Sequence, residues 1–148
     1  MSRIFVSFST ALACDFHHVV SVESSLLSSA DIAYNQAANG EAVQATVEQY
    51  LAQLDNSERV RKGAVLPHVP IKPDLAVVDP PRSGLGEPVA RRLANLGAPR
   101  VTYVSCDPAT LARDLVYVLA AGYRVEQAHL VDLFPQTYHL ESVVHLVQ

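Results

Sequence analysis

The sequence predicts an α/β domain built around a mainly parallel sheet. Short runs rich in Val, Ile and Tyr alternate along the chain with longer helix-like segments, which is the pattern of βαβ units. The chain has 148 residues, of which 49% are hydrophobic, so it can bury a substantial core as one domain. No internal repeat or low-complexity linker divides it. We therefore expect one structural unit over residues 1–148.

The expected strands are apolar, β-branched runs bounded by turn residues. They lie at 18–23, 43–48, 75–79, 100–105, 123–131 and 142–147. The run 75–79 is apolar up to its last residue, Asp79, as in a strand that is covered on both faces. Only a short connection separates the last two strands, so we expect them to pair antiparallel at one edge of the sheet.

Helices are expected between these strands, at 24–39, 49–62, 87–96 and 108–121. Ser24 is a candidate N-cap for the first of them, and Gly40 a candidate stop. Pro108 suits the first turn of the last helix, and Gly122 lies just beyond its end. Three prolines within 63–73 predict a loop before the strand at 75–79.

Charge and cysteine content restrict the function classes. The net charge of -4 gives no whole-molecule attraction to phosphate, so nucleic-acid binding would have to use a local patch or another domain. Only Cys14 and Cys106 are present, which argues against a disulfide framework, a zinc site or an iron–sulfur cluster. A reducing, cytoplasmic location is expected. No apolar stretch approaches the roughly 20 residues needed to span a bilayer, so no membrane association is expected.

Polar residues gather where three expected strands end. Glu23, Asp79 and Cys106 each lie at or just beyond a strand's carboxyl end, where ligands bind in open α/β sheets. A carboxylate in the position of Glu23 suits the two hydroxyls of a ribose, but a carboxylate taken alone more often caps the following helix or is solvated. Asp79 precedes two prolines that fix a stiff turn, which either presents the carboxylate to a ligand or simply ends the strand.

Cys106 has two interpretations. A lone intracellular cysteine is more often a small buried hydrophobic residue than a reactive one. This cysteine, however, leaves a strand immediately before the expected start of a helix, and a helix N-terminus favours the thiolate. Its position therefore indicates a nucleophile.

Three motifs stand out along the chain. They are Asp79-Pro80-Pro81-Arg82-Ser83-Gly84, Val104-Ser105-Cys106-Asp107-Pro108 with Thr110-Leu111-Ala112-Arg113-Asp114, and Asp132-Leu133-Phe134-Pro135 with Thr137, His139 and Glu141. Together they resemble the signature of the S-adenosylmethionine-dependent RNA uridine-C5 methyltransferases, which make 5-methyluridine in tRNA or rRNA. They follow the family's order and approximate spacing. The resemblance covers residues 8–148 and implies a class I methyltransferase (Rossmann-like) sheet, mostly parallel with an antiparallel edge.

The resemblance also implies roles for individual residues. Cys106 corresponds to the nucleophile that adds to C6 of uracil, and Glu141 to the base that removes the C5 proton after methyl transfer. Asp79 and Glu23 match cofactor-binding positions, and the adenine-contacting position falls near Gln49. The implied cofactor is S-adenosyl-L-methionine, the implied partner is a tRNA or rRNA substrate, and no metal is implied.

The chain departs from the family at its start. Members carry a glycine-rich loop after the first strand, but no glycine precedes Gly40 here. Residues 8–13 resemble the helix that follows that loop, and residues 3–7 are either a remnant of the first strand or unrelated to it. The resemblance thus implies a partial catalytic domain, truncated before or within the loop. The alternative function is an incompetent remnant that acts at most as an interaction module.

Overall fold

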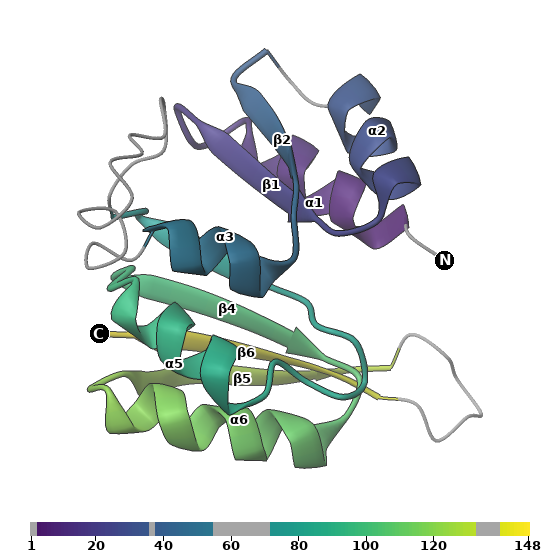
Figure 1. The fold of residues 1–148 in the computed structure, drawn as a ribbon. Helices are drawn as coiled ribbons and strands as arrows, with labels where there is room; N and C mark the ends of the chain where they lie inside the picture. Colours follow the sequence, from purple (N-terminus) through teal and green to yellow (C-terminus); the bar gives the residue numbers. More distant parts are fainter. Residues whose placement is uncertain (1–2, 36–37, 55–71, 133–139) are drawn as a thin grey trace.

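The computed structural model describes residues 3–35, 38–54, 72–132 and 140–148. Within these ranges, helices and strands follow one another as expected for an α/β chain (Figure 1). The elements are α1 (Arg3–Leu12), β1 (Val19–Glu23), α2 (Leu26–Asn35), β2 (Gly40–Gln44), α3 (Val47–Leu54), β3 (Leu75–Val78), α5 (Glu87–Asn95), β4 (Arg100–Ser105), α6 (Pro108–Ala120), β5 (Arg124–Val131) and β6 (Glu141–Val147).

The described strands form two sheets. β1 and β2 make a parallel pair, and the second sheet has the order β3-β4-β6-β5. β3 runs parallel to β4, whereas β6 runs antiparallel to both β4 and β5. This confirms the expected antiparallel pairing of the last two strands. Because β6 lies beside β4 and runs antiparallel to it, the start of β6 and the end of β4 lie at the same end of the sheet.

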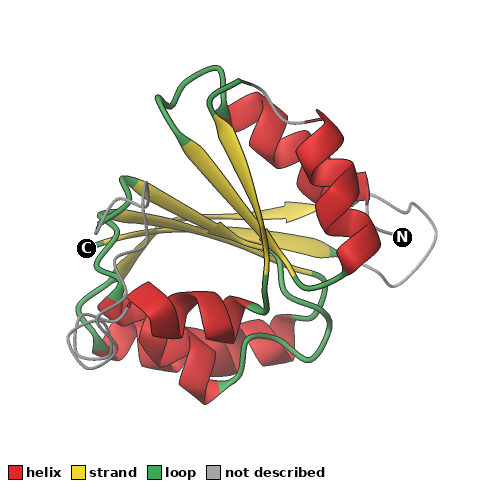
Figure 2. Ribbon diagram, turned by 45° about the horizontal axis from the view of Figure 1, so that its top comes forward, coloured by secondary structure: helices red, strands yellow, loops and turns green. Residues whose placement is uncertain are grey.

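Helices cover one face of the four-stranded sheet. α5 and α6 lie together against that face, α3 packs against α5, and α1 and α2 pack against the β1–β2 pair (Figure 2). The buried apolar cluster lies between the sheet and α3, α5 and α6, and it comprises Leu51, Leu54, Ala90, Leu93, Ala94, Ala98, Val101, Tyr103, Leu111, Val118, Tyr123, Val144 and Leu146. None of the helices in the described ranges is long and apolar enough to cross a membrane.

Local sequence explains the helix starts near the candidate site. Asp107 caps α6, because its Oδ1 accepts hydrogen bonds from the backbone N–H groups of Ala109 and Thr110 at 3.0 and 3.1 Å. Pro108 occupies the first turn, where its missing N–H costs nothing. Gly122 follows the helix with a φ of 98°, a conformation that glycine adopts without strain.

Several expected boundaries were wrong in the first third of the chain. Gly40 does not stop a helix but opens β2, where it pairs with Val19. β2 ends at Gln44, not at residue 48, because Thr46 caps α3 and turns the chain into the helix. The cap of α2 is Ser25, whose Oγ accepts a hydrogen bond from the Ser28 N–H at 3.4 Å, and not Ser24.

The start of the chain is helical. α1 covers Arg3–Leu12 as one helix, so the interpretation of residues 3–7 as a strand remnant was wrong, while the helix expected at 8–13 is confirmed to Leu12. Most of the loop expected at 63–73 lies outside the described residues.

Candidate active site

Three of the expected site residues lie at one end of the four-stranded sheet, where β3 and β4 finish and β6 begins. Asp79 follows β3, Cys106 follows β4 and Glu141 begins β6, at the edge toward which the β4 arrow points in Figure 1. The last pair of the β4–β6 ladder is Ser105 with Ser142, and Cys106 and Glu141 are the residues next to that pair. The two residues therefore lie at the same end of the β4–β6 pair.

The charge of Glu141 acts on the carboxylate of Asp79. Burial raises the pKa of Asp79, and the negative charge of Glu141 raises it further. Glu141 is therefore close enough for its charge to act on Asp79, although the two residues are far apart in the sequence. Both side chains and that of Cys106 are half-buried, so all three are partly exposed to solvent.

A rigid turn holds Cys106 at the start of α6. The hydroxyl of Ser105 donates to the Asp107 carbonyl at 3.0 Å and accepts from the Asp107 N–H at 3.1 Å, so the residues on both sides of Cys106 are joined. The backbone N–H groups at the helix start lower the pKa of Asp107, with Thr110 as the largest contributor. This shows that the end of the helix next to Cys106 favours negative charge.

Glu23 lies at the end of β1, in the other sheet. Its Oε1 accepts hydrogen bonds from the Ser25 N–H at 2.8 Å and from the Ser24 hydroxyl at 3.3 Å. The carboxylate thus satisfies backbone and side-chain donors ahead of α2, which is the capping role foreseen as the alternative to ribose binding.

Gln49 takes part in a capping box at the start of α3. Its Oε1 accepts from the Thr46 N–H at 3.0 Å, and the Thr46 hydroxyl accepts from the Gln49 N–H at 3.1 Å. Within the described ranges, no hydrogen bond or ion pair joins Glu23 or Gln49 to Asp79, Cys106 or Glu141. The structure therefore brings three of the five expected site residues together and leaves two on neighbouring elements.

Sequence reasoning missed the centre of the polar network beside this edge. Asp114 is 0% exposed and lies between Leu111 and Val118 on the buried side of α6. It accepts a hydrogen bond from the buried hydroxyl of Tyr103 at 2.7 Å. The available signal was the spacing, since a carboxylate placed three residues after one apolar residue and four before another lies on the apolar face of a helix.

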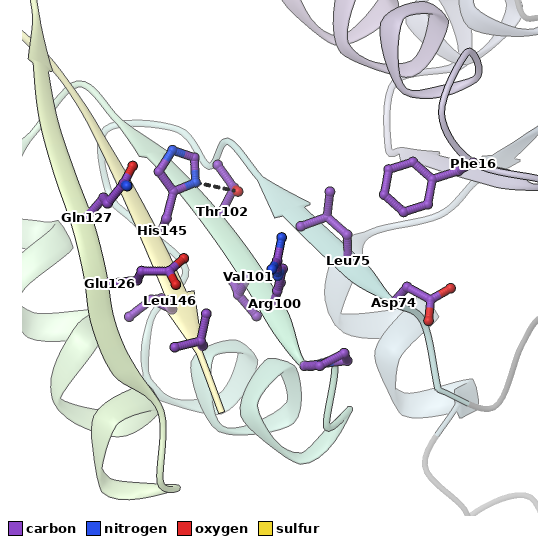
Figure 3. A pocket seen from close by; sticks show the side chains of 12 residues that line it. Phe16, Asp74, Leu75, Arg100, Val101, Thr102, Glu126, Gln127, His145 and Leu146 are labelled. Carbon is purple, nitrogen blue, oxygen red and sulfur yellow. Dashed lines mark hydrogen bonds between the residues drawn. The ribbon is translucent and has the colours of Figure 1, made fainter.

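An open groove of about 610 Å³ lies at the opposite end of the same sheet (Figure 3). Residues at the starts of β3 and β4 line it, together with β5 and β6, and Thr102 Oγ1 lies 3.0 Å from His145 Nδ1 there. The lining includes neither Cys106 nor Asp79 nor Glu141. We place the candidate active site at the other end of the sheet, because Asp79, Cys106 and Glu141 lie there.

An open α/β sheet with polar groups beyond the carboxyl ends of its strands is the general form of a ligand-binding α/β domain. The chain superimposes on the crystal structure of a Pyrococcus abyssi tRNA (uracil-54, C5)-methyltransferase in complex with S-adenosyl-L-homocysteine, with a TM-score of 0.72 and 27% identity. The match covers 97% of this chain and 32% of that one. The expected methyltransferase fold, with parallel strands and an antiparallel edge, is thereby confirmed.

The chain belongs to the tRNA (uracil-5-)-methyltransferase family, whose model matches residues 5–148. Among curated proteins it is 48% identical over 92 residues to an uncharacterised RNA methyltransferase of Streptomyces avermitilis, covering 60% of this chain and 21% of that protein. It is also 48% identical over 75 residues to one from Thermotoga maritima, covering 51% of this chain and 17% of that protein. The chain thus spans about a fifth of the length of these relatives.

Proposed function

We propose that this chain is a partial catalytic domain of an RNA methyltransferase that transfers a methyl group from S-adenosyl-L-methionine to C5 of a uridine in tRNA or rRNA. The observation that supports this most is the placement of Cys106 and Glu141 next to the last pair of the β4–β6 ladder, with Asp79 within reach of the charge of Glu141. Family membership supports the reaction class.

Cys106 acts as the nucleophile. Its thiolate forms a bond to C6 of the uracil, and the C5=C6 electron pair moves to C5, which becomes an enolate carbon. C5 would then accept the methyl group that bound S-adenosyl-L-methionine supplies, and the cofactor would leave as S-adenosyl-L-homocysteine. Covalent addition is needed because C5 of uracil by itself is a weak nucleophile.

Glu141 acts as the general base. After methyl transfer, C5 still carries a proton, and the carboxylate removes it. The electrons of the C5–H bond restore the C5=C6 double bond, and the C6–sulfur bond breaks to release the Cys106 thiolate. A base on the strand beside the nucleophile can reach C5 because C5 and C6 are adjacent atoms of one ring.

Three of the chain's own residues are candidates for holding the cofactor. S-adenosyl-L-methionine supplies an electrophilic methyl group when bound. The Glu23 carboxylate offers roughly four acceptor sites and uses two of them for Ser24 and Ser25, so about two remain for a ribose diol. Asp79, at the end of β3, would lie between the cofactor and the target uracil. Gln49 would contact the adenine through its side-chain NH₂ group, because its capping bond uses only Oε1.

The test is covalent trapping. Incubating the chain with tRNA or rRNA and the methyl donor should give an RNA adduct on a denaturing gel that turns over, whereas Glu141→Gln should let the adduct form and persist. Cys106→Ala should form none, and Cys14→Ala is the matched control that should behave as the wild-type chain. Adduct formation by the Cys106→Ala variant would refute the assignment.

The alternative function, an incompetent remnant, has its own test. Calorimetric titration with S-adenosyl-L-methionine should show binding that Glu23→Ala weakens. Absence of binding by the wild-type chain would favour the remnant.

A further inference from the structure

The carboxylate of Asp114 is fully buried and fully engaged. Oδ2 accepts hydrogen bonds from the Leu85 N–H at 2.6 Å and the Tyr103 hydroxyl at 2.7 Å. Oδ1 accepts from the Gly86 N–H at 3.2 Å and from Arg113 Nε and Nη2 at 3.0 and 2.8 Å. A buried carboxylate is tolerated only when it is paired and hydrogen-bonded in this way, so the network holds each of its members firmly.

Two of these donors belong to the loop that continues the Asp79 motif. The same helix holds this loop at two further points: the Thr110 hydroxyl donates to the Arg82 carbonyl at 3.0 Å, and Arg113 Nη2 donates to the Ser83 carbonyl at 2.8 Å. The backbone from Arg82 to Gly86 is therefore tied to α6 along its length. We call residues 82–86 the clamped loop.

Gly84 shows how closely the clamped loop fits against α6. Its φ is 74°, and a Cβ at this position would lie 2.5 Å from Asp114 Oδ2 and 2.6 Å from Arg113 Nη2. Only glycine leaves room for the backbone to approach the carboxylate this closely.

The contacts between the clamped loop and α6, which we call the clamp, join the two halves of the candidate active site. The loop begins shortly after Asp79, and α6 begins shortly after Cys106, so the loop–helix contacts act together with the β3–β4 pairing on how these two residues sit relative to each other. Geometry at a reacting centre is demanding, and a misplacement of about 1 Å costs on the order of 100-fold in rate. Arg82, at the start of the loop, also bears on Asp107, whose pKa its positive charge helps to lower.

We propose that Asp114 is a positioning residue, which holds the clamped loop against α6 and thereby keeps Asp79 correctly placed relative to Cys106 for the reaction. The proposal rests on the proposed function, because this placement matters for catalysis only if both residues take part in that reaction. The clamp itself is a property of the chain without RNA, so the two can be tested apart.

The central variant is Asp114→Asn, which keeps the shape of the side chain but sets an NH₂ group against hydrogen-bond donors. In the chain without RNA, we expect amide exchange at Leu85 and Gly86 to become at least about tenfold faster, since local opening governs exchange. Alkylation of Cys106 should also become faster, while alkylation of Cys14, which serves as the internal reference, stays unchanged. Unchanged exchange or unchanged Cys106 alkylation would overturn the proposal.

With RNA and the methyl donor, the same variant should separate rate from binding. We expect the rate constant of Cys106 adduct formation to fall at least about tenfold, with the RNA concentration at half-maximal rate changed less than about twofold. A purely structural role would instead lower the folded fraction, and so the amplitude, while the folded molecules kept their rate constant. That result would also overturn the proposal.

Two further variants keep the test decisive. Tyr103→Phe removes a donor from the same carboxylate oxygen but none of the loop contacts, so it should lower stability and leave the adduct rate constant unchanged. Gly84→Ala pushes on the clamp from the loop side and should reproduce the Asp114→Asn effects, which covers the case in which Asp114→Asn does not fold. If the wild-type chain forms no adduct, the proposed function fails, while the exchange and alkylation measurements still decide on the clamp.

Discussion

Replacing Tyr103 by Phe removes one buried, charge-assisted hydrogen bond and little else. The side chain is 0% exposed, and its hydroxyl lies 2.7 Å from Asp114 Oδ2. Hydrogen bonds to charged groups contribute about 1.5–3 kcal/mol to stability. Because Oδ2 keeps the Leu85 N–H at 2.6 Å, we expect a loss in the lower part of that range, about 2 kcal/mol.

The loss should be visible in thermal and urea unfolding. At about 3 °C per kcal/mol for a chain of this length, the Tm should fall by about 6 °C. The chain has no Trp, so far-UV circular dichroism is the suitable signal. Tyr34→Phe is the matched control, because Tyr34 is 89% exposed and its hydroxyl can be removed at little cost.

The difference between wild type and variant should also depend on pH in a defined direction. Burial raises the pKa of Tyr103, and the hydrogen bond to Asp114 raises it further. The stabilisation is therefore fully present below the unfolded-state pKa of about 10 and declines as the pH rises above it. A destabilisation below about 0.5 kcal/mol at pH 7, or one equal to that of the exposed control, would refute the reasoning that Asp114 is a charged acceptor.

Two further predictions concern stability. Burial and the charge of Glu141 raise the pKa of Asp79, so ionisation of Asp79 opposes folding, and stability is lost as the pH rises from about 4 through the raised pKa. Asp79→Asn should abolish this decline and raise the Tm at pH 7. A variant whose stability has the same pH profile as the wild type between pH 3 and 7 would contradict this prediction. Thr46→Ala should lower the free energy of unfolding by about 1 kcal/mol in urea titration, because it removes the cap of α3. No loss on that substitution would show that the capping box does not support the helix.

Sequence reasoning succeeded where element ends carry strong local signals. The strand expected at 100–105 is β4 without any change, and the helix expected at 108–121 is α6 to within one residue. A β-branched run, an Asp-Pro start and a following glycine are local features, and each of them acts in the structure as its chemistry predicts.

Sequence reasoning was weaker where pairing partners decide the outcome. β2 starts at Gly40, a residue that local rules assign to a helix end, because its backbone pairs with Val19 of β1. The hydrogen bond from the Thr46 N–H to Gln49 Oε1 starts α3, and that strand therefore ends early. Strand boundaries depend on a partner strand whose position local sequence does not contain.

By itself, the sequence determined the class of fold and the chemical groups of the site. Cys106, Asp79 and Glu141 stand out in the order of amino acids alone, as strand-end residues or members of a motif. Their placement at one end of the sheet was decided by tertiary structure, because the antiparallel pairing of β6 with β4 puts Glu141 beside the strand end that precedes Cys106. The clamp around Asp114 was likewise decided there, since its donors come from a loop and a strand that only folding brings to the same carboxylate.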